Sequence, residues 1–159
     1  MPTKFQLITE LYDQTVQSVT GSYQSWTGFL RAACYNYKCP FDDQILIYAQ
    51  RPDATACADF DIWNNRMNRY VRRGAKGIAL LDESSGFPRL HYVFDVSDTG
   101  VRRNSRDPEV WQFNDDLKQP VSEMLNKTYG ISGERVSQQL ADVAGRLVAD
   151  YLSLIHISE

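Results

Sequence analysis

The sequence predicts an α+β fold in which N-terminal helices lead into a small antiparallel sheet and C-terminal helices follow it. Apolar residues recur at helical spacing before residue 50 and again after residue 116, whereas the stretch at about residues 77–96 alternates in the manner of a β-hairpin. The chain has 159 residues, of which 43% are hydrophobic. That length and composition suffice for a globular domain with its own core and argue against disorder.

Three helices are expected before residue 50. Residues 4–19 and 26–37 each carry apolar side chains at the three- and four-residue spacing of one helix face, and a Gly-Ser pair separates them. Pro40 ends the second helix and suits the first turn of a third. Asp42 and Asp43 would then lie near the positive end of the helix dipole, where acids are stabilising.

The middle of the chain is expected to form the sheet. Residues 58–65 predict a short helix in which Trp63 takes a core position. Residues 77–82 and 89–96 predict a hairpin, and the apolar side chains on one face of its second strand are Leu90, Tyr92, Phe94 and Val96. The stretch that follows, residues 97–116, predicts a polar loop that holds Arg102, Arg103 and Arg106.

Two further helices are expected, one over residues 120–129 and one that Ser132 caps and that runs to Tyr151. The last eight residues resemble the translation of a common sequencing-library adapter. We therefore expect the native sequence to run only to about residue 151, the chain to be the N-terminal part of a longer protein, and His156 to have no role. The expected divisions are an N-terminal helix, a central domain, helices leading into missing sequence, and an artefact, over residues 1–20, 21–116, 117–151 and 152–159.

Charge is distributed unevenly along an acidic chain whose formal net charge is −3. Residues 66–106 carry nine basic and four acidic side chains, a balance of +5. The flanks carry four basic and seven acidic side chains over residues 1–65, and four basic and nine acidic ones over residues 107–159. A local excess of cations in an acidic chain favours a polyanionic ligand for that segment.

Several other classes of function find no support in the sequence. The chain has no secretory signal core and an odd number of cysteines, which predicts reduced thiols and a cytoplasmic location for Cys34, Cys39 and Cys57. No apolar run reaches the roughly 18 residues of a membrane span. Outside the suspect tail, His91 is the one histidine, and paired zinc-ligand motifs, a Walker loop and a nuclease motif are absent. We expect no metal, no cofactor and no catalytic residue here.

Residues 63–78 hold the candidate binding site, which contains no acid and whose cations are Arg66, Arg69, Arg72, Arg73 and Lys76. Arginine binds phosphate through planar paired donors. Tyr70 is the first candidate to stack on an unpaired base, with Tyr35 or Tyr37 as further ones. Gly74 and Gly77 are expected to shape a turn into the hairpin. The alternative is a solvated face whose cations pair with acids of the flanks, and composition leaves both interpretations open.

Short motifs in a fixed order carry a resemblance over residues 22–100. An aromatic helix ends in Asn36 and Tyr37, and an apolar helix runs into Gln-Arg-Pro-Asp-Ala-Thr at residues 50–55. Trp63 precedes an Arg-x-Val-Arg-Arg-Gly-x-Lys-Gly-Ile run, and a strand ends in Val-Phe-Asp-Val-Ser. Together these pieces resemble the N-terminal single-stranded-DNA-binding domain of ArdC antirestriction proteins. That domain also occurs in conjugative primases and in large helicase or DNA-methylase proteins of mobile elements.

The resemblance implies a non-catalytic module that holds single-stranded DNA for a mobile-element protein involved in conjugation. The five cations would contact phosphates, which predicts a salt slope of about −3.5 for the binding constant. Asn68 stands where the family has Gly before Arg69, and we expect it to shape the turn because Asn tolerates a left-handed backbone. Asp98 stands where Gln is common, and its negative charge would weaken a nearby phosphate contact.

Two other functions stay open. The module would dock an acidic protein partner or other domains of the parent chain, or it is part of a helicase or methylase whose active site lies in the missing sequence. The zinc-protease-like C-terminal domain of ArdC proteins has no counterpart in these residues.

Overall fold

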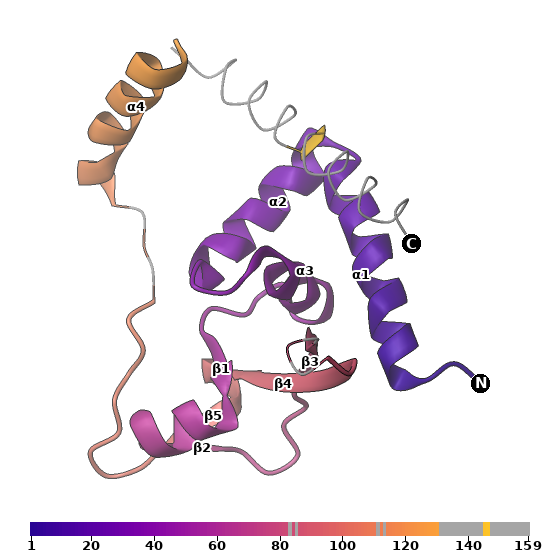
Figure 1. Cartoon of the computed structure of the whole chain (residues 1–159). Coiled ribbons are helices and arrows are strands. Elements are labelled where there is room, and N and C mark those ends of the chain that lie inside the picture. Colours follow the sequence, from indigo (N-terminus) through magenta and orange to yellow (C-terminus); the bar gives the residue numbers. More distant parts are fainter. Residues whose placement is uncertain (83, 85, 111, 113, 131–144, 147–159) are drawn as a thin grey trace. The chain divides into compact units, whose positions relative to one another are not determined.

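The computed structural model describes residues 1–82, 84, 86–110, 112, 114–130 and 145–146 (Figure 1). Apart from residues 145–146, the expected helix that begins at Ser132 lies outside these residues, as does the expected artefact at residues 152–159. The chain divides into two compact units, residues 1–16 with 29–110 and residues 17–28 with 111–159. All the candidate site residues lie in the first unit.

The three expected N-terminal helices are present as α1 (Lys4–Thr20), α2 (Tyr23–Ala33) and α3 (Phe41–Gln50). Thr3 and Gln6 cap α1 reciprocally, since Gln6 Oε1 accepts from the Thr3 N–H at 2.8 Å and Thr3 Oγ1 accepts from the Gln6 N–H at 3.2 Å. A 3-10 turn (Cys34–Asn36) follows α2. Pro40 precedes α3, and the two expected acids occupy the first turn of that helix.

The core of the first unit lies where α3 packs against β3 (Ile78–Asp82). Phe29 of α2 meets two aromatic rings edge to face, at centroid distances of 5.8 Å and 5.6 Å, and these belong to Phe41 and Tyr48. The side chains of α3 and β3 that complete this core are Ile45, Leu46, Ile47, Ile78, Ala79 and Leu80. The α+β class predicted from the sequence is therefore confirmed.

The expected hairpin is confirmed, with β3 antiparallel to β4 (Arg89–Asp95) and Ile78 opposite Val93. A third strand, β1 (Cys57–Asp59), pairs with the other edge of β4, so the order is β1-β4-β3. The prediction of a helix over residues 58–65 was wrong at its start. Residues 57–59 pair with β4, and a π-helical turn (Ile62–Arg66) follows. Backbone partners on β4 outweighed the helical spacing of the side chains in this stretch.

A second sheet of two strands was missed by the sequence prediction. It joins β2 (Arg69–Val71) to β5 (Thr99–Val101), with Tyr70 opposite Gly100. The polar loop expected over residues 97–116 therefore begins with a 3-10 turn and a strand. Each of the two strands has three residues. Alternation over so short a run is too weak a signal to predict a strand.

The second unit contains α4 (Asp115–Tyr129), which begins five residues before the expected start at Pro120. Asp115 and Asp116 fill its first turn, where acids favour the helix dipole, and Lys118 Nζ lies 2.6 Å from Asp115 Oδ1. Pro120 therefore lies inside the helix. Gly130 ends it in the left-handed conformation, with φ of 66°. Among the helices described here, none is both long enough and apolar enough to cross a membrane.

Candidate nucleic-acid interface

The cations predicted from the sequence follow one another along a turn, a strand and a second turn. Arg66 ends the π-helical turn, Arg69 begins β2, and the others lie between β2 and β3. Four of the five side chains are exposed, namely Arg66, Arg72, Arg73 and Lys76. Residues 66–76 are called the first basic segment below.

Arg69 differs from the other four because its side chain is only 8% exposed. Its Nε–H donates to Thr99 Oγ1 at 2.8 Å, and its Nη1 lies 2.6 Å from Asp107 Oδ1. Thr99 in turn is 1% exposed and donates to the Val96 carbonyl at 2.7 Å. This geometry does not fit the phosphate contact expected for Arg69. It gives the residue a structural role between β2, β5 and the segment that follows β5.

The residues expected to shape the turns do so in two different ways. Asn68 has φ of 50° and Gly74 has φ of 86°, both in the left-handed region that the turns require. Gly77 is not left-handed. Instead, a Cβ at this position would lie 3.2 Å from Phe94 Cζ and 3.2 Å from Tyr92 Cβ, so packing against β4 leaves little room for a side chain.

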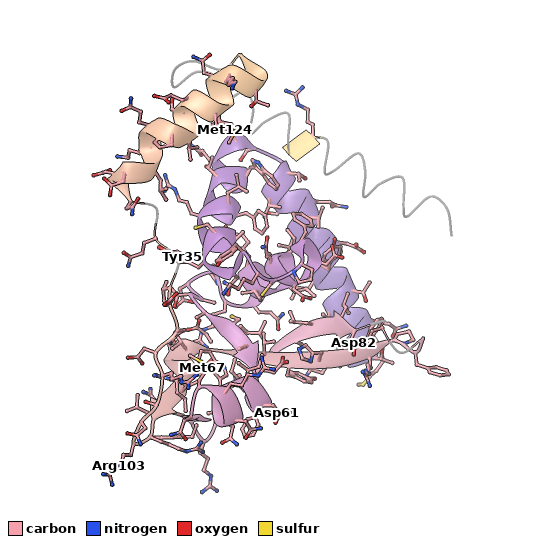
Figure 2. The ribbon with its side chains drawn as sticks, turned by 60° about the vertical axis from the view of Figure 1, so that its left-hand side comes forward. Tyr35, Asp61, Met67, Asp82, Arg103 and Met124 are labelled. Atoms are coloured by element: carbon pink, nitrogen blue, oxygen red, sulfur yellow. The ribbon has the colours of Figure 1, made fainter. Side chains whose placement is uncertain are left out.

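A second basic segment, residues 102–106, lies against the first. The Asn68 Nδ2–H donates to the Arg103 carbonyl at 2.8 Å, and the Arg106 N–H donates to the Met67 carbonyl at 2.8 Å. The Arg102 Nη1–H reaches the Arg69 carbonyl at 3.3 Å. Figure 2 shows Arg103 at the lower edge of the unit, with its guanidinium extending away from the ribbon. The three exposed arginines of this segment are Arg102, Arg103 and Arg106.

Three acids near the basic segments are occupied by other partners. Asp98 Oδ2 lies 2.6 Å from Arg51 Nη1, Asp107 binds the buried Arg69, and Asp82 lies 2.6 Å from Arg89. Among the described residues, the seven exposed cations of the two basic segments form no ion pair with an acid. The pairing that a merely solvated face was expected to show is therefore not found in this part of the chain.

Tyr70 lies on β2 within the first basic segment and is 44% exposed. Its ring covers Gly100 on the opposing strand so closely that a Cβ there would lie 2.3 Å from Tyr70 Cζ. The Arg102 guanidinium lies 5.8 Å from the ring centroid, within the range of a cation–π contact. The other aromatic candidates, Tyr35 and Tyr37, belong to the region of the 3-10 turn after α2.

The motif at residues 50–55 forms hydrogen bonds with β3 and with the motif at residues 93–97. Gln50 holds Ala79 of β3 through two hydrogen bonds, of 2.8 Å and 2.9 Å. Asp95 is 2% exposed, and its carboxylate accepts from the N–H groups of Thr55, Ala56 and Ser97 and from the Ser97 hydroxyl. Burial by itself raises the pKa of Asp95, but these hydrogen bonds outweigh it and lower the pKa below its ordinary value. These motif residues are structural.

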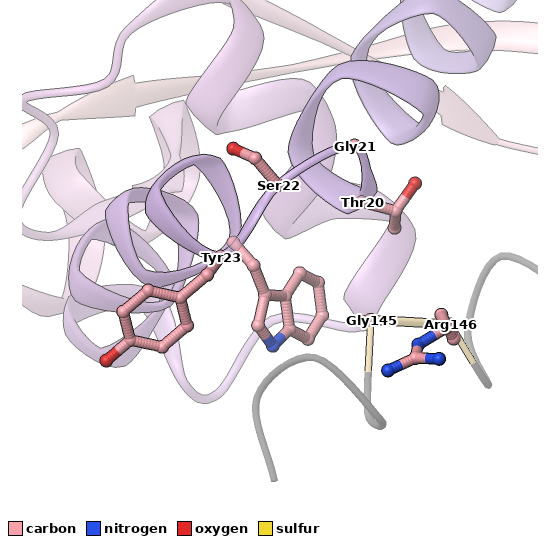
Figure 3. Close-up of a pocket in the computed structure, with 7 residues that line it drawn as sticks. Thr20, Gly21, Ser22, Tyr23, Gly145 and Arg146 are labelled. Carbon is pink, nitrogen blue, oxygen red and sulfur yellow. The ribbon is translucent and has the colours of Figure 1, made fainter. Parts of the chain in front are cut away.

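The described residues hold little that favours catalysis. The three cysteines are free and partly buried, and burial raises the pKa of each thiol, so the thiolate is disfavoured. No group of three or more His, Cys, Asp or Glu side chains in the described part of the chain is arranged to hold a metal ion. A hollow of about 200 Å³ in the second unit (Figure 3) contains no candidate site residue and is lined by Thr20, Gly21, Ser22, Tyr23, Trp26, Gly145 and Arg146.

Comparison of the chain with models of protein families, with curated proteins and with solved structures finds no match. The function therefore has to be argued from the geometry of the β2–β5 sheet and the two basic segments. The sequence prediction missed Gly100, Thr99 and Asp107. Among residues 99–107, only the three arginines at residues 102–106 stood out in the sequence as basic residues. Their charge did not indicate that they lie beside β2.

Proposed function

We propose that this module binds single-stranded DNA without catalysis, through phosphate contacts of the exposed cations Arg66, Arg72, Arg73 and Lys76. The observation that carries the proposal is the set of exposed cations without acidic partners, in a chain whose net charge is negative. Unpaired cations in the turns that flank β2 attract a polyanion without first breaking existing ion pairs.

The preference for a single strand over a duplex rests on Tyr70. An exposed ring next to cations offers a flat apolar face on which an unpaired base stacks, whereas the bases of a duplex are already stacked on one another. Stacking and phosphate contacts are tolerant of sequence, so we expect a weak sequence preference. The role in a conjugative mobile-element protein of the cytoplasm belongs to the same proposal.

The test is binding of a labelled oligothymidylate of about 20 nucleotides, and of a duplex of equal length, to the whole chain. The double variant Arg72→Glu with Arg73→Glu should bind the single strand at least about tenfold more weakly. Arg31→Glu, which reverses an exposed cation on α2 away from the basic segments, should change the affinity less than about twofold. Equal losses in both variants, or tighter binding of the duplex, would contradict the proposal, and competition by an acidic peptide alone would favour the protein-docking function.

A further inference from the structure

We propose that residues 102–106 form the second half of the phosphate-binding surface, and that Asp107 strengthens the binding of the anionic strand although it is itself an acid. The inference rests on the proposed function. It assigns the strand a footprint from two segments whose contacting residues are more than 30 positions apart in the sequence. It also assigns Asp107 a positioning role that its charge would not suggest.

The second basic segment has a defined conformation. The Ser105 N–H donates to the Arg102 carbonyl at 3.0 Å, which closes a turn, and Asn104 takes the left-handed conformation inside it with φ of 63°. The arginine side chains on either side of Asn104 are exposed. The turn therefore presents its cations to solvent from a fixed backbone.

Three consecutive residues of the first basic segment form hydrogen bonds with this turn and with the residue that follows it. Met67 accepts from the Arg106 N–H, Asn68 donates to the Arg103 carbonyl, and Arg69 binds Asp107. The first two are single hydrogen bonds near the surface, where water competes. The third involves a guanidinium that is 8% exposed and that Thr99 also holds, so it is the most constrained of the three.

Removal of the negative charge on Asp107 has two opposed effects. Its side chain is 86% exposed, so by Coulomb's law alone its removal should favour a bound polyanion. Its removal would also leave the buried Arg69 guanidinium without its acidic partner and release the end of the second basic segment. Three arginines would then have to be ordered on binding, at a cost in conformational entropy. We expect this second effect to be the larger one.

The chain offers a matched control in Glu109. This acid lies two residues further on, is exposed, and has no hydrogen bond or ion pair among the described residues. Asp107→Asn and Glu109→Gln remove the same charge from neighbouring positions of the same segment. Only the first of them weakens the contact with Arg69.

The experiment measures oligothymidylate binding to the whole chain and its variants, with circular dichroism and thermal melting to confirm that each variant is folded. Asp107→Ala should weaken binding about tenfold, Asp107→Asn should lie between it and wild type, and Glu109→Gln should leave binding unchanged or tighten it up to about threefold. Tighter binding by both Asp107→Asn and Glu109→Gln would overturn the positioning role of Asp107.

A second pair of variants tests the footprint without touching the buried guanidinium. Arg103→Gln with Arg106→Gln removes two exposed cations and should make the salt slope shallower by about 1.4. An unchanged slope would overturn the second half of the surface, while leaving the proposed function intact. Failure of the wild-type chain to bind the single strand would instead remove the proposed function itself.

Discussion

The ring of Tyr70 lies over the backbone of Gly100, its directly opposed residue in the antiparallel β2–β5 pair. A Cβ at residue 100 would lie within 2.3–2.7 Å of three atoms of the Tyr70 side chain, so any residue other than glycine would displace the ring. An aromatic ring laid across a cross-strand glycine stabilises a short two-stranded sheet and fixes its own orientation. The same contact therefore supports the sheet and orders the ring of Tyr70 beside the second basic segment.

Substitution of Gly100 by Ala should displace Tyr70. We expect a loss of about 2 kcal/mol in the free energy of unfolding, because the added methyl group forces the ring off the strand backbone that it covers. Urea denaturation of the single variants and of the double variant measures this directly. If the collision is the cause, Gly100→Ala should cost much less in the Tyr70→Ala background, and a cost that is equal in both backgrounds would argue against it.

Substitution of Tyr70 by Leu should weaken binding to a strand that carries bases and leave binding to an abasic strand of equal length unchanged. The expected loss on oligothymidylate is about tenfold, which corresponds to about 1.4 kcal/mol of lost stacking. Tyr92→Leu serves as the control, because Tyr92 is also exposed but lies on β4 of the other sheet. Equal losses on both strands would mean that Tyr70 does not stack on a base.

Asp95 should stabilise the fold in a pH-dependent way. Asp95→Asn replaces an acceptor of four hydrogen bonds by a group with one acceptor oxygen, and should cost about 3 kcal/mol in the free energy of unfolding near neutral pH. Because the folded-state pKa of Asp95 lies below the ordinary value of 3.8, its contribution is fully present above that value and is lost as the pH falls through the folded-state pKa.

The measurement for Asp95 is the difference in unfolding free energy between wild type and Asp95→Asn as the pH is lowered. The difference should be constant between about pH 7 and pH 5 and should shrink below about pH 4. A difference that grows on acidification would mean that the carboxyl group is protonated more readily in the folded state than in the unfolded chain, contrary to the hydrogen-bond pattern.

Gly74→Ala should cost about 1 kcal/mol in the free energy of unfolding, solely through the backbone. Residue 74 has φ of 86°, and a Cβ there would meet no atom within 4 Å. Gly74→Asn, which tolerates the left-handed region better than Ala, should cost less. Equal costs for both variants would indicate that the turn changes conformation and does not keep its strained backbone.

The helices and the hairpin could be predicted from the sequence because their signals are local. The cap of α1 and the proline before α3 lie next to the helix starts, and the alternation in β4 covers enough residues to be distinguished from a helix. Strands β1, β2 and β5 have three residues each, and their pairing depends on partners about 30 to 40 residues away. Periodicity carries no information about such partners.

The candidate site was predictable in part for a similar reason. A run of cations without acids identifies a basic segment, and Asn and Gly mark its turns. Whether a given arginine faces solvent depends on its partner, and the acid that binds Arg69 lies 38 residues further along the chain. The arginines at residues 102–106 could be read from the sequence. Their place beside β2 depends on the hydrogen bond that the Met67 carbonyl accepts from Arg106 and on the one that Asn68 donates to the Arg103 carbonyl.

The measurement that tests the central claim most directly is the dependence of the single-strand binding constant on salt for the whole chain. Seven exposed cations on phosphates predict a slope of about −4.9 in a plot of log binding constant against log salt concentration, or roughly a thousandfold loss over a fourfold rise in salt. A slope near −2.8 would indicate that only the four exposed cations of the first basic segment contact phosphates. Binding that does not respond to salt, or no binding of the single strand at low salt, would contradict the account.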